Sequence, residues 1–176
     1  RNTGWAATTR VIDPSADRID VAGDPHCGGC GFAHVVHGRQ LQLKRAIIDD
    51  ALRRLGRIAL ESPLEIAPSP VEGYRMRARL HVAGGRVGFV REGTHQLCDP
   101  TPTRQLRTDT LDATTRVVAE CERLQPGAVS AVVVSENVDA SQRACHIELS
   151  SEASPGRLAP MASMAGVAGV SCAPVG

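Results

Sequence analysis

The sequence predicts an α+β fold, with an antiparallel sheet and flanking helices. Two stretches carry apolar residues at helical spacing, and a strictly alternating stretch ends in a Gly-Gly turn, which is typical of a β-hairpin. Helices and hairpins follow one another without the strand–helix–strand regularity of a parallel sheet. The length of 176 residues suits one ordinary domain, or one domain with part of a neighbour attached.

The N-terminal third is expected to combine a strand, turns and a helix. Residues 1–12 are expected to form the last strand of a preceding fold, and residues 13–38 carry the glycines and prolines of turns. A helix is expected over 39–56, where Gly56 ends it. Its inward face is expected to hold Leu41, Ile48, Leu52 and Leu55.

Lys44 is the only lysine of the chain, and it falls inside the apolar sector of this expected helix. A lysine in such a position usually extends its stem to water. The alternative is a functional amine that reaches a phosphate.

A β-hairpin is expected next, because residues 74–82 alternate strictly between apolar and basic side chains. One side would present Tyr74, Met76, Ala78, Leu80 and Val82, and the other Arg75, Arg77, Arg79 and His81. The turn Gly84-Gly85 returns the chain over 86–91, which pairs Leu80 with Phe89 and Val82 with Val87. Arg86 then lies on the basic side.

The C-terminal half is expected to pack a second helix on further strands. The helix would cover about 108–124, with Val117, Val118 and Cys121 inward. The later elements are expected to be strands at about 128–135 and 144–150, a short helix at about 157–164 and a last strand at about 167–172.

Charge is distributed unevenly along a chain whose formal net charge is only +1. Residues 39–107 hold 13 Lys and Arg against 7 Asp and Glu, whereas residues 108–176 hold 4 against 8. A locally basic stretch favours a side that faces a polyanion. Aromatic residues are 2% of the chain, which argues against a platform of stacked aromatic side chains for nucleic acid.

The first residues of the chain and its hydropathy are the two features that indicate where in the cell the protein is found. The sequence begins Arg-Asn-Thr, which suggests a piece of a longer protein. It has no apolar run long enough to cross a bilayer and no signal peptide at its start. A cytoplasmic location is therefore expected.

Six cysteines are present, of which only Cys27 and Cys30 are close in sequence, as Cys-Gly-Gly-Cys. From spacing alone, this pair is open to two readings: two free thiols or a local disulfide, or a zinc site completed by His34 and His37. The other four cysteines are expected to be small buried hydrophobic residues.

Three segments together resemble the RNA uracil-C5 methyltransferase family, whose members use S-adenosylmethionine to form 5-methyluridine. They are Cys27–Cys30 with His34 and Gln40–Arg45, then Gly73–Val82, then Arg86–Leu97. Their order and spacing agree with the family over roughly residues 13–107.

The resemblance implies three parts in a complete enzyme: an RNA-binding TRAM barrel, a central α/β domain with an iron–sulfur site, and a Rossmann-like catalytic domain. This chain resembles the central domain over 21–176, preceded over 1–20 by the tail of the barrel. The chain has no glycine-rich loop after a strand, so this segment is not expected to bind S-adenosylmethionine. Ser171-Cys172-Ala173-Pro174 imitates the family's nucleophile motif, but Gly176 stands where threonine belongs, and Cys172 is not expected to be catalytic.

The iron–sulfur site implied by the resemblance uses four cysteines. Cys27 and Cys30 match two of them, but residues 1–26 contain no cysteine and Thr103 occupies the later position. Cys98, five residues earlier, is the candidate substitute. A complete cluster is therefore not expected.

The resemblance implies an RNA-positioning central domain of an enzyme that modifies ribosomal or transfer RNA. The residues expected to contact RNA are Arg75, Arg77, Arg79, Arg86 and Lys44. The alternative for the arginines is a solvated strand face with carboxylate partners from a neighbouring element. The alternatives for the whole are a non-enzymatic RNA-binding or metal-binding protein that lost the chemistry, or a degraded paralogue; no protein partner is evident.

Overall fold

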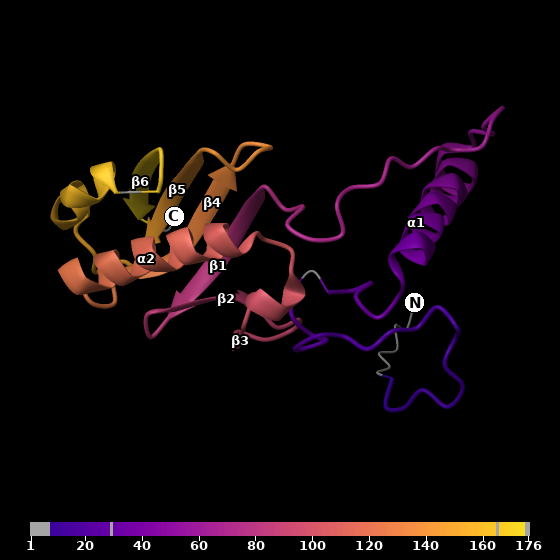
Figure 1. The fold of residues 1–176 in the computed structure, drawn as a ribbon, viewed down its shortest axis with the longest axis horizontal. Helices are drawn as coiled ribbons and strands as arrows, with labels where there is room; N and C mark the ends of the chain where they lie inside the picture. Colours follow the sequence, from indigo (N-terminus) through magenta and orange to yellow (C-terminus); the bar gives the residue numbers. More distant parts are fainter. Residues whose placement is uncertain (1–7, 29, 165, 175–176) are drawn as a thin grey trace. The chain divides into compact units, whose positions relative to one another are not determined.

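The computed structural model of the chain describes residues 8–28, 30–164 and 166–174. They form two compact units (Figure 1). The first unit comprises the described residues up to Asp20 together with Phe32–Ile66, and the second comprises Val21–Gly31 together with the described residues from Ala67 onward.

The second unit contains a six-stranded sheet in the order β3-β2-β1-β4-β5-β6. Its strands are β1 Arg77–Ala83, β2 Arg86–Val90, β3 Leu97–Cys98, β4 Val129–Glu136, β5 Arg143–Leu149 and β6 Gly169–Pro174. All neighbours are antiparallel except β6, which runs parallel to β5. A parallel neighbour requires a crossover, and the connection that includes the 3₁₀ helix Pro155–Ser163 provides it. The predicted α+β class is confirmed.

The predicted hairpin is present with the predicted register. Val82 is opposite Val87 and His81 is opposite Gly88, which places Leu80 and Phe89 together in the core. Strand β1 begins at Arg77, however, and Tyr74 and Met76 are exposed rather than inward. The chain before β1 is held by the loop after Thr103 instead, because the amides of Gly73 and Arg75 donate to the carbonyls of Arg104 and Gln105.

Helix α2, Thr108–Leu124, covers one face of this sheet (Figure 1). Its inward side chains include Val117, Val118 and Cys121, as predicted. Helix α2 packs against β2, β4 and β5, and this layer, with fully buried strand residues such as Leu80 and Ile147, is the hydrophobic core of the second unit.

The first unit contains α1, His37–Ala51, which continues as a π-helical turn over Leu52–Gly56. The predicted inward face of this helix is wrong for the described residues: α1 buries no residue, and Ile48 and Leu55 are 42% and 82% exposed. Helical spacing predicts an apolar stripe on the helix, but it does not show which other part of the protein, if any, packs against that stripe. Residues 8–12 form no strand, and the remainder of the strand expected over 1–12 lies outside the described residues.

Candidate nucleic-acid interface

The basic side of the hairpin lies on the sheet face opposite α2. Along β1, Ala78 and Leu80 are buried beneath the helix layer, so the alternating side chains Arg77, Arg79 and His81 point to the other face. Arg86 is opposite Ala83 in the register, which places it on that same face. We call Arg77, Arg79, His81 and Arg86 the basic face.

Arg79 is already engaged by a carboxylate of β5. Its Nε and Nη2 donate to the two carboxylate oxygens of Glu148 at 2.7 and 2.6 Å. The hydrogen bonds from Arg79 hold the pKa of Glu148 below its usual value. At Arg79, therefore, the alternative of a solvated strand face with carboxylate partners from a neighbouring element is the one observed. The same contact fixes the direction of the Arg79 guanidinium.

His81 extends this network along β1. Its Nε2 lies 2.7 Å from Nη1 of Arg79. Because a guanidinium only donates, Nε2 accepts and neutral His81 carries its proton on Nδ1. Burial first, and then the charge of Arg79, lower the pKa of His81.

The other predicted RNA-contacting residues are in different surroundings. Arg75 precedes β1, and its side chain is engaged by the protein itself. It donates to Oε1 of Gln105 at 2.7 Å, and its guanidinium carbon lies 5.2 Å from the centre of the Phe89 ring. Arg77 and Arg86 are exposed and, among the described residues, have no carboxylate within salt-bridge distance. They are the two unpaired cations of the basic face.

Polar side chains of β5 and β6 continue the uncovered face. His146 is opposite Ser171 in the register, and its Nδ1 lies 2.9 Å from the Ser171 hydroxyl. Sequence reasoning singled out neither of these residues nor Glu148. The alternation of Ala144, His146 and Glu148 with buried Cys145, Ile147 and Leu149 is the signal that could have found them.

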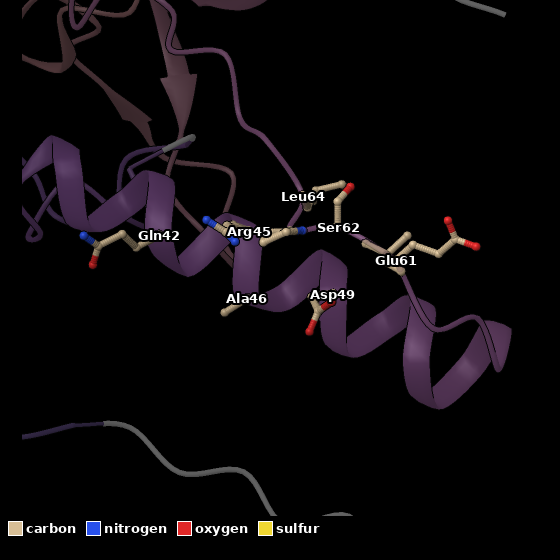
Figure 2. A pocket seen from close by; sticks show the side chains of 9 residues that line it. Gln42, Arg45, Ala46, Asp49, Glu61, Ser62 and Leu64 are labelled. Atoms are coloured by element: carbon tan, nitrogen blue, oxygen red, sulfur yellow. The ribbon is translucent and has the colours of Figure 1, made fainter.

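Lys44 lies in the first unit, on exposed α1, whereas the four arginines belong to the second unit. Beside it, α1 and the returning segment 60–64 line an open cavity of about 550 Å³ (Figure 2). Its lining mixes Arg45 with Asp49 and Glu61, so charges of both signs face the space. This mixture is typical of a solvated groove rather than of an anion site.

Cys27 and Cys30 form neither a pair of free thiols nor a disulfide with each other. Cys27 forms a disulfide with Cys98, 71 residues away, while Cys30 keeps a buried free thiol. His34 and His37 belong to the first unit, whereas Cys27 and Cys30 belong to the second. Within the described ranges, no group of three or more His, Cys, Asp or Glu side chains is arranged to hold a metal.

The remaining cysteines pack as small hydrophobic side chains. Burial raises the pKa of Cys121 to about 12 and that of Cys145 to about 11, so both are protonated and unreactive at neutral pH. Cys172 is half-buried on β6, opposite Ile147.

An α+β domain with one sheet face packed and the other basic has the features of a polyanion-binding domain. No family model matches the chain. The chain is 36% identical over 91 residues to the 23S rRNA (uracil(1939)-C(5))-methyltransferase RlmD of Acidovorax sp., covering 47% of this chain and 19% of that protein. It is 28% identical over 105 residues to an RNA methyltransferase of Listeria monocytogenes, covering 56% and 23%.

Among solved structures, the fold matches the Pyrococcus abyssi tRNA (uracil-54, C5)-methyltransferase in complex with S-adenosyl-L-homocysteine. The TM-score is 0.56 at 21% identity, over 84% of this chain and 36% of that one. The chain spans about a fifth of the length of the curated relatives it matches. It is related to RNA (uracil-C5) methyltransferases over part of their length, and the resemblance predicted from its motifs is confirmed.

Proposed function

We propose that this chain is the RNA-positioning domain of an S-adenosylmethionine-dependent RNA (uracil-C5) methyltransferase that acts on ribosomal or transfer RNA in the cytoplasm. The observation that carries the proposal is the sequence relationship to enzymes named for this reaction. No helix in the described part of the chain is long and apolar enough to cross a bilayer.

In such an enzyme, the role of this chain is to bind and orient RNA. Arg77 and Arg86 offer unpaired guanidinium groups, which suit bidentate contacts with phosphate. Arg79 is held in a fixed direction by Glu148, so a phosphate that approaches it competes with that carboxylate. The scarcity of aromatic residues makes phosphates, rather than stacked bases, the main contacts.

S-adenosylmethionine supplies the methyl group in this reaction class, but the described residues do not fit that cofactor. The sheet has one parallel pair, and α2 is preceded by Arg104-Gln-Leu-Arg107 rather than by a glycine-rich loop that follows a strand. The contribution of this chain is therefore assigned to substrate positioning alone.

The salt dependence of RNA binding tests the proposal. Each phosphate neutralised adds about −0.7 to the slope of log K against log salt for a single strand. Replacing both Arg77 and Arg86 with glutamine should therefore flatten the slope by about 1.4, measured by fluorescence anisotropy with a labelled oligouridylate between about 25 and 200 mM salt.

Arg116→Gln provides the matched control. Arg116 is exposed on α2, which covers the opposite face of the sheet, and its substitution removes one positive charge, against two in the double variant. The control should keep the parent slope. Equal slopes in the double variant and the control, or loss of the double variant's melting transition, would contradict a role of the basic face in RNA binding.

A further inference from the structure

A short segment, Val21–Gly31, connects two parts of the first unit yet belongs to the second. The chain leaves the first unit after Asp20 and returns to it at Phe32. The segment is therefore joined to the first unit at both of its ends. The contacts that hold the segment in place lie entirely within the second unit, at its β2–β3 edge.

Backbone and side-chain contacts hold the segment to this edge. Cys27 forms an isolated antiparallel bridge with Arg91, and the Glu92 amide donates to the His26 carbonyl at 2.9 Å. The Gln105 side-chain amide donates to the Gly28 carbonyl at 3.1 Å, and Gln105 is itself buried. These contacts bring Cys27 to β3, where Cys98 lies.

The donor set at this position does not fit an iron–sulfur cluster. A cluster takes four thiolates, whereas the sulfurs of Cys27 and Cys98 are bonded to each other and carry no charge. Thr103, at the position of a further family cysteine, donates its hydroxyl to the Pro100 carbonyl at 2.6 Å. Only the Cys30 thiol is left as a donor from the predicted set.

We propose that Cys27 and Cys98 are a redox pair whose disulfide takes the place of the cluster and fastens Val21–Gly31 to the sheet edge. The Cα atoms are 5.8 Å apart and both side chains are buried. Oxidation by glutathione disulfide joins the two sulfurs and releases two molecules of reduced glutathione. Reduction by a dithiol delivers two electrons and two protons, restores two thiols and leaves the reductant as a cyclic disulfide.

Cys30 does not compete for this pairing. Burial, followed by the carboxylate of Asp24, raises the pKa of the Cys30 thiol. In the structure, Cys27 is bonded to Cys98, and the Cys30 thiol stays free and buried. The geometry therefore supports the long-range pair and not a Cys27–Cys30 bridge.

Peptide mapping of the whole chain tests the pairing. After equilibration in an oxidising glutathione buffer, free thiols are alkylated under denaturing conditions, and the digest is analysed by mass spectrometry without reductant. The expected result is a Cys27–Cys98 cross-linked peptide with Cys30 alkylated. A Cys27–Cys30 cross-link, alkylation of both Cys27 and Cys98, or stoichiometric iron and sulfide in anaerobically purified protein would overturn the proposal.

Hydrogen exchange tests the fastening. On reduction with dithiothreitol, exchange at the Cys30 and Glu92 amides should rise at least tenfold, while amides of β4 and β5 are unchanged. Cys98→Ser should show the fast exchange in either buffer, and Cys172→Ser, which removes a thiol outside the pair, should keep the redox response. Equal exchange in the oxidised and reduced parent, or a redox response that persists in the Cys98 variant, would overturn it.

Discussion

At the scale of single residues, Glu148 sets how much of the basic face is available to an anion. It is the carboxylate that pairs with Arg79, and its side chain is 20% exposed against 43% for Arg79. An ion pair with this much solvent contact stabilises the fold by less than about 1 kcal/mol. The pair therefore matters more for the charge of the face than for folding.

Glu148→Gln should strengthen RNA binding. The substitution removes the negative charge that competes with phosphate for Arg79, so the affinity should rise about threefold at low salt, with the melting temperature nearly unchanged. Anisotropy titrations with the same oligouridylate provide the measurement. Glu152→Gln removes an equal charge at an exposed position outside the sheet and is the control; an equal gain in both variants would mean that only net charge matters.

The same residues show what sequence patterns predict and what they omit. Alternation over 77–82 correctly placed Arg77, Arg79 and His81 on one face, because the period of a strand is a local property. The partner of Arg79 is 69 residues away, and that of Cys27 is 71 residues away. Local periodicity carries no information on which distant strands are neighbours, so it predicted neither contact; only the family resemblance placed Cys98 in the same candidate site as Cys27.

At the scale of elements, the narrow strand pair β2–β3 depends on one glycine. A Cβ at Gly88 would lie 2.6 Å from the Cys98 carbonyl oxygen and 3.3 Å from the Leu97 Cβ, and the oxygen belongs to the backbone of the paired strand β3. Gly88 belongs to the stretch whose sequence carried the family resemblance, and the structure gives the physical reason for a glycine at this position.

Gly88→Ala should destabilise the second unit by about 1–3 kcal/mol, the usual cost of forcing an extra methyl group into a packed site. Urea denaturation followed by circular dichroism would measure the change in the free energy of unfolding. Gly31→Ala is the control, because a Cβ there meets no atom within 4 Å. If Gly88→Ala lowers the free energy of unfolding no more than Gly31→Ala does, strands β2 and β3 can move apart at little cost and the prediction is wrong.

Helix α1 was predicted correctly as a helix but wrongly as a buried one. The spacing of Leu41, Ile48, Leu52 and Leu55 correctly predicted a helix, which the structure forms over His37–Ala51 and continues through the π-helical turn. The same spacing also predicted burial, which requires a second surface that no period within the helix can specify. By contrast, α2 has such a surface in the sheet, and its predicted inward residues are buried.

At the scale of the whole molecule, the topology of the sheet separates substrate binding from cofactor binding. Nucleotide cofactors bind at the carboxyl ends of parallel strands, where a glycine-rich loop leads into a helix N-terminus. Here five neighbouring strands are joined by antiparallel pairings, and only β5 and β6 are parallel. The geometry that presents a phosphate-binding helix end to a cofactor is therefore missing from the described sheet, while the sheet face opposite α2 carries the basic side chains.

Isothermal titration of this chain with S-adenosylmethionine should accordingly give no heat beyond dilution. The expectation follows from the sheet topology and from the residues before α2, which offer no close backbone approach to a nucleotide. Titration of the same preparation with oligouridylate at low salt serves as the positive control, because it shows that the protein is folded and competent to bind. Heat that fits a single saturable site for S-adenosylmethionine would mean that this chain holds cofactor as well as RNA, and the assignment to substrate positioning alone would then be wrong.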